Sequence, residues 1–187
     1  MRQRLGLAIV SMIVALGLAA CGSDSAPPPV PTNWPLPADP SAAAQKAGLP
    51  MLSREMLEVH YHAHLDVIVR NTRITVPAYI GIDTKKPAIT ALHTHDTTGI
   101  VHIESEKDIP FTLGQFFTEW GQPLSSVEVG PVVATSDEQV RVYRNGKLVP
   151  GNPAALKLGA HDEIVVWMGP TDANPKVPSS FNFPEGL

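Results

Sequence analysis

The chain has 187 residues and a formal net charge of −4, with 14 Lys and Arg against 18 Asp and Glu, and it contains one cysteine. An acidic chain lacks the basic surface that a phosphate backbone requires, which argues against nucleic acid as a partner. With no second cysteine for a disulfide or a thiolate cluster, any metal site must use nitrogen and oxygen ligands.

The first twenty residues are predicted to be a targeting segment. Arg2 and Arg4 precede an apolar run, Leu5 to Leu18, which is too short for a comfortable membrane span. The run ends in Leu-Ala-Ala-Cys21, which resembles the lipobox of bacterial lipoproteins. The resemblance implies cleavage before Cys21, lipidation of that cysteine and anchoring on the outer side of a bacterial membrane. The alternative is an ordinary secretory signal with an incidental cysteine.

Composition divides the remainder into three parts. Residues 21–50 are rich in Ser, Ala and Pro, which predicts an extended tether after the lipidated cysteine. Trp34 within the tether either docks on the domain or stays unpacked. Residues 51–171 are predicted to form a single histidine-rich, β-dominated domain, and residues 172–187 a Pro-rich, loop-like tail.

The first histidine motif, His-Tyr-His-Ala-His-Leu-Asp over residues 60–66, is typical of a β-strand. Side chains two residues apart in a strand share a face, so His60, His62, His64 and Asp66 are expected on one face. Tyr61 and the apolar residues that alternate after it then form the other face, which suits a core.

A hairpin is expected to follow this strand. Residues 73–82 also alternate, and a two-residue turn at Asn71-Thr72 would pair Arg70 with Arg73 and set His64 opposite Tyr79. A β-branched Thr disfavours the positive φ of such a turn, so a slightly longer loop is the alternative.

The second histidine motif, His-Thr-His-Asp-Thr-Thr-Gly-Ile-Val-His over residues 93–102, predicts another hairpin. Asp96 to Gly99 has turn chemistry, and a four-residue loop there pairs His95 with Ile100 and His93 with His102. The three histidines would then face the same way, with Glu104 two residues further on. Directly opposed Cβ atoms lie roughly 4.5–5.5 Å apart, which lets two imidazoles share an ion.

The C-terminal half predicts an α+β fold, a mostly antiparallel sheet with one packed helix. Thr112 to Trp120 carries a capping box and an apolar stripe, and Asn145-Gly146 marks a hairpin. The run from Val142 through the last predicted strand, residues 163–168, resembles the closing half of ubiquitin-like β-grasp domains. That resemblance implies a central last strand and carries no function.

Six of the seven histidines lie within 43 residues, and neutral imidazole is a common ligand of transition metals. We therefore predict a metal site. The first-choice ligands are five histidines that belong to a His-x-His pair or lie opposite one: His62, His64, His93, His95 and His102. Further ligands, or groups that orient an imidazole, are His60, Asp66, Asp96 and Glu104. His161, alone in a turn, is expected at the surface.

Nitrogen ligands with optional carboxylates suit copper first and zinc second. The motifs of residues 60–66 and 93–102, together with Thr-Leu-Gly-Gln-Phe-Phe, also resemble uncharacterised histidine-rich envelope lipoproteins. The leading hypothesis is a membrane-anchored protein that sequesters, delivers or senses the ion. One alternative is a metal-dependent hydrolase or oxidase with a three-histidine site. Another is a non-catalytic β-grasp module that contacts an envelope protein.

Overall fold

A computed structural model describes residues 28–55 and 58–187 of the chain. The targeting segment and Cys21 lie outside the described residues, so their predicted roles stay predictions. Within the described ranges, no helix has both the length and the apolar character needed to cross a bilayer.

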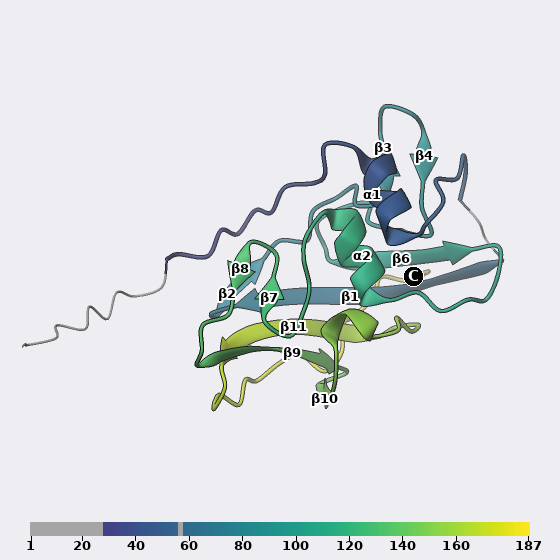
Figure 1. Cartoon of the computed structure of the whole chain (residues 1–187). Helices are drawn as coiled ribbons and strands as arrows, with labels where there is room; N and C mark the ends of the chain where they lie inside the picture. Colours follow the sequence, from purple (N-terminus) through teal and green to yellow (C-terminus); the bar gives the residue numbers. More distant parts are fainter. Residues whose placement is uncertain (1–27, 56–57) are drawn as a thin grey trace, which may run out of the picture.

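The fold is α+β, as predicted. Its main sheet has the strand order β10-β9-β11-β1-β6-β5, and β2 also pairs with β1 (Figure 1). Central β11 (Glu163–Pro170) runs parallel to β1 (Val59–Val69), whereas the other pairs are antiparallel. The last strand, β11, therefore lies between β9 and β1 within the sheet. The other strands of the sheet are β2 (Thr72–Ile74), β5 (Leu92–His93), β6 (Ile100–Ser105), β9 (Glu138–Arg144) and β10 (Lys147–Val149).

Short elements complete the chain outside the main sheet. They are α1 (Pro40–Ala47), the strand pair β3 (Ile82–Asp83) and β4 (Ala88–Ile89), the pair β7 (Glu128–Val129) and β8 (Val132–Val133), and the 3-10 turn η1 (Pro153–Ala155).

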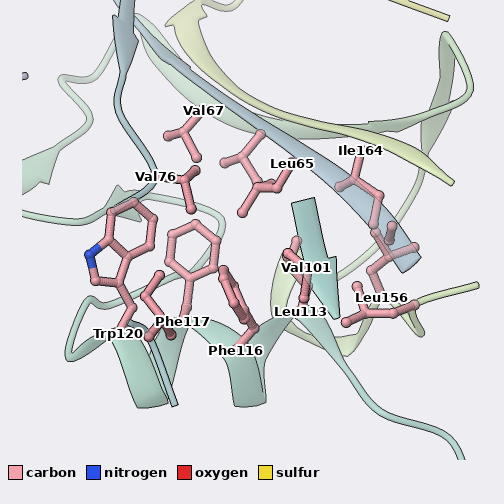
Figure 2. Close-up of a cluster of buried hydrophobic side chains, with 14 of the residues drawn as sticks. Leu65, Val67, Val76, Val101, Leu113, Phe116, Phe117, Trp120, Leu156 and Ile164 are labelled. Atoms are coloured by element: carbon pink, nitrogen blue, oxygen red, sulfur yellow. The ribbon is translucent and has the colours of Figure 1, made fainter. Parts of the chain in front are cut away.

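One face of the sheet is covered by α2 (Leu113–Trp120), whose apolar side chains meet those of β1, β6 and β11 (Figure 2). The predicted capping box is present: Thr112 accepts from the Gln115 backbone N–H, and the Gln115 side chain accepts from that of Thr112. Gly121 ends the helix in the left-handed conformation. Phe116 and Trp120 are fully buried, which confirms the aromatic stripe as core.

The turn after β1 differs from the prediction. Val69 pairs with Thr72, so the turn residues are Arg70 and Asn71, with φ of 49° and 63°. Positive φ at both positions is type I′ geometry, which Asn tolerates and a β-branched Thr resists. Strand β2 is also much shorter than predicted. Tyr79 lies in a turn with φ of 68°, so it does not pair with His64.

The predicted tether needs correction over residues 28–50. Trp34 is buried against Trp120, with ring centroids 5.4 Å apart, and Leu49 joins the same core. Between them α1 is capped by Asp39 and ended by Gly48 in the left-handed conformation. Burial of the tryptophan orders this Pro-rich segment, because a large aromatic surface leaves water when it packs.

The opposite face of the sheet carries the histidines of β1 and β6 and a small apolar cluster of Tyr143, Val165 and Trp167. Residues 172–187 hold no helix or strand, as predicted, but they pack on this face. Their Phe181 ring stacks on His64, and the C-terminus lies near the β1–β6 pair (Figure 1).

Candidate metal centre

Three adjacent strands position the histidines. His62 on β1 pairs with His102 on β6, and His102 pairs with His93 on β5 on its other side. His60 lies opposite Glu104 in the same β1–β6 pairing. The predicted His93–His102 pairing is confirmed, and the alternation of β1 directs the histidines of that strand to the face opposite α2.

The first group of side chains is His60, His62 and His102, whose ligand atoms lie within 4.8 Å of one another. His62 Nε2 lies 3.1 Å from both His60 Nε2 and His102 Nδ1. Bonds of about 2.0–2.1 Å to a tetrahedral ion separate two nitrogens by about 3.3 Å, which is close to this spacing. The Nε2 atom of a neutral His62 has either one proton to donate or one lone pair to accept with, so it cannot form good hydrogen bonds to both neighbouring nitrogens. An ion between the three rings would instead accept a lone pair from each of the three nitrogens.

The second group is His93, His95 and His102, again within 4.8 Å. His93 is fully buried, and its Nδ1 lies 3.0 Å from the Thr90 carbonyl. Since a carbonyl only accepts, Nδ1 carries the proton and Nε2 presents a lone pair. That lone pair is buried and has no hydrogen-bond partner among residues 28–55 and 58–187. A buried lone pair without a partner is costly, and binding an ion would remove the cost.

The cluster has a buried floor and an exposed rim. His62 and His93 are buried, whereas the side chains of His60 and His95 are 36% and 44% exposed. The imidazoles of His60 and His95 are therefore the members of the cluster most exposed to solvent.

Glu104 lies beside both groups. Its Oε1 is 3.4 Å from His60 Nε2, 3.6 Å from His93 Nε2 and 3.9 Å from His102 Nδ1, and the side chain is 4% exposed. This places a carboxylate close enough to act as a ligand or to orient an imidazole, the two roles predicted for it.

Burial keeps three of the clustered histidines neutral. Burial, followed by the nearby charge of His60, lowers the pKa of His62 to about 4. Burial and His102 lower the pKa of His93 to about 3. Burial and His62 lower the pKa of His102 to about 4. All three imidazoles thus keep a lone pair for an ion at neutral pH.

His64 does not join these groups. Its Nδ1 lies 2.7 Å from Glu163 Oε2 and its Nε2 lies 3.0 Å from the Thr98 carbonyl, so both nitrogens already face oxygen. The Phe181 ring stacks on it at 3.8 Å between centroids and 6° between planes. His64, Asp66 and Glu163 form a third group of possible ligands, separate from the five clustered histidines.

The remaining candidates have other partners. Asp66 accepts from Arg73, and Asp96 accepts from the Thr98 backbone and hydroxyl, which holds the loop and lowers the pKa of Asp96. His161 is exposed, as expected, with φ of 56°.

The sequence analysis did not identify two residues that contact His64, namely Glu163 and Phe181. Glu163, the partner of His64, begins a strand whose parallel register with β1 no local pattern reveals. Phe181 lies in a tail without periodicity. His60, placed outside the first choice because it begins its strand, belongs to the first group, since β1 extends to Val59.

Comparisons with protein-family models, with curated proteins and with solved structures find no match to this chain. The geometry of the histidine cluster is therefore the feature of this chain that points to a function.

Proposed function

We propose that this protein binds a transition-metal ion through the clustered histidines, in order to sequester, deliver or sense it in a bacterial envelope. The observation that carries the proposal is the buried Nε2 of His93, which has no hydrogen-bond partner among the described residues although His93 belongs to one group of possible ligands with His95 and His102. The close approach of His60, His62 and His102 supports the same conclusion.

Copper is the first choice of metal and zinc the second. The groups offer mainly imidazole nitrogen, which suits Cu(II) and Zn(II), whereas calcium and magnesium prefer oxygen. The three groups among the described residues contain no thiolate, a ligand that favours Cu(I).

Metal titration of the untagged chain tests the proposal. We expect tight binding of Cu(II), with a visible d–d band, and weaker binding of Zn(II). His95→Ala is the sharpest variant because the side chain is 44% exposed and its loss leaves the core intact. Removing it should lower the affinity by at least tenfold, and His93→Ala by more.

His161→Ala is the matched control, since this histidine is exposed and lies outside all three groups. Equal affinities for the three variants, or no binding by the unaltered chain, would refute the metal site.

The lipid anchor is a separate proposal. Cys21 at the end of the apolar run would be lipidated and hold the domain on the outer side of the membrane. Cys21→Ala should move the protein from the membrane fraction to the soluble fraction, and retention in the membrane fraction would contradict the anchor.

A further inference from the structure

The five clustered histidines divide into two groups of three that share His102. The division follows from the sheet: β6 is the middle strand, with β1 on one side and β5 on the other. Among the described residues, no group of possible ligand atoms lying within 4.8 Å of one another takes histidines from both β1 and β5. Ligand atoms of one ion lie at most about 4.2 Å apart, since each bond is about 2.0–2.1 Å long.

His102 is suited to serve both groups. It pairs directly with His62 on one side and with His93 on the other. Its ring centroid lies 4.5 Å from that of His62, 5.1 Å from that of His93 and 4.5 Å from that of His95. An imidazole ring has two nitrogens, and each can bind one ion when the ring gives up its N–H proton.

From this arrangement we propose that the cluster holds two metal ions with His102 shared between them, an inference that rests on the proposed metal-binding function. His60 and His62 complete the ligands of one ion, and His93 and His95 those of the other. Entry of the second ion releases the remaining ring proton of His102 to solvent.

The position of Glu104 supports two ions. Its Oε1 lies between the groups, 3.4 Å from His60 Nε2 in one and 3.6 Å from His93 Nε2 in the other. A buried carboxylate there supplies negative charge that offsets the repulsion between two divalent cations.

The test is the stoichiometry of Cu(II) bound to the untagged full chain, measured by equilibrium dialysis and metal analysis. We expect two ions per chain. A single ion would overturn the shared centre while the proposed function stands, and the absence of binding would refute the proposed function itself.

Electron paramagnetic resonance then tests the sharing of His102 without any variant. Two Cu(II) ions bridged by one imidazole couple magnetically, so the signal of isolated Cu(II) should grow with the first equivalent and fall with the second. A signal that doubles would show two independent ions and overturn the shared imidazole.

Two paired variants locate the ions. His60→Ala with His62→Ala, and separately His93→Ala with His95→Ala, should each bind one Cu(II) with an uncoupled signal. His161→Ala, the matched control, should still bind two. Two ions bound by either paired variant would contradict the assignment of ligands.

Discussion

The two faces of the sheet both bury ionisable side chains, but with different surroundings. On the α2 side, Glu119 of the helix is 2% exposed, and burial raises its pKa to about 8 against a side-chain hydrogen bond with Thr90 that lowers it. On the opposite face, buried imidazoles gather with a carboxylate, and burial lowers the pKa of three of them. Desolvation favours the neutral form in both places. Among the described residues, only the second face brings several neutral imidazoles together, and this distinguishes the candidate site from the single buried carboxyl of Glu119.

The largest change in the free energy of unfolding is expected for Phe116→Ala, which tests whether α2 is held to the sheet by its aromatic side chains. Phe116 is fully buried between the helix and the sheet, so Phe116→Ala should lower the free energy of unfolding by about 3–5 kcal/mol. Denaturant unfolding of the metal-free protein measures it. A loss below about 1 kcal/mol would mean that the aromatic stripe does not hold the helix to the sheet.

Because of Glu119, the free energy of unfolding is expected to fall as the pH rises. Its folded pKa of about 8 exceeds its ordinary value of 4.5, so the folded state binds the proton more tightly. The stability that this preference gives is complete below pH 4.5 and is lost as pH rises through 8. Each pKa unit corresponds to about 1.4 kcal/mol, so the loss between pH 5 and 8 is at most about 4 kcal/mol.

Glu119→Gln should remove that dependence, because the amide stays neutral. Unfolding of the metal-free protein at pH 5 and pH 8 measures the difference, and Glu106→Gln at an exposed carboxylate is the matched control. The same decline with pH in the Glu119 variant as in the original chain would refute the assignment.

Local patterns in the sequence account for much of this architecture. Three such patterns are the alternation in β1, the capping box of α2 and the turn chemistry of residues 96–99. The elements that they predict are formed by contacts between residues that are close in sequence. The His93–His102 pairing follows from one loop length. These features depend on neighbours within about ten residues, which is the range that a sequence pattern reports.

Long-range contacts explain what the sequence leaves open. The parallel register of β1 with β11 brings Glu163 to His64, across 99 residues, and thereby separates His64 from the five clustered histidines. Trp34 packs against Trp120 and Gly130, which lie far along the chain. Neither local propensity nor composition encodes which distant partner a side chain meets.

His64→Ala tests whether this histidine contributes to stability or to metal binding. It leaves the buried Glu163 carboxylate without its imidazole, so the free energy of unfolding should fall by about 1–3 kcal/mol. The affinity for Cu(II) should stay within about twofold, since both His64 nitrogens point to other partners. A loss of affinity comparable to that of His95→Ala would place His64 among the ligands after all.

The smallest effect concerns the C-terminal tail. Phe181 stacks on His64, whereas Phe183 packs on the exposed His161, so the two rings form a matched pair with different surroundings. Phe181→Ala should lower the free energy of unfolding by about 1 kcal/mol, a typical value for a stacked pair, and Phe183→Ala by less. Denaturant unfolding and Cu(II) titration measure both variants. Because Phe181 stacks on His64, whose two nitrogens face other partners, Cu(II) affinity should be unchanged, and a tenfold loss would show that the tail helps to build the metal site.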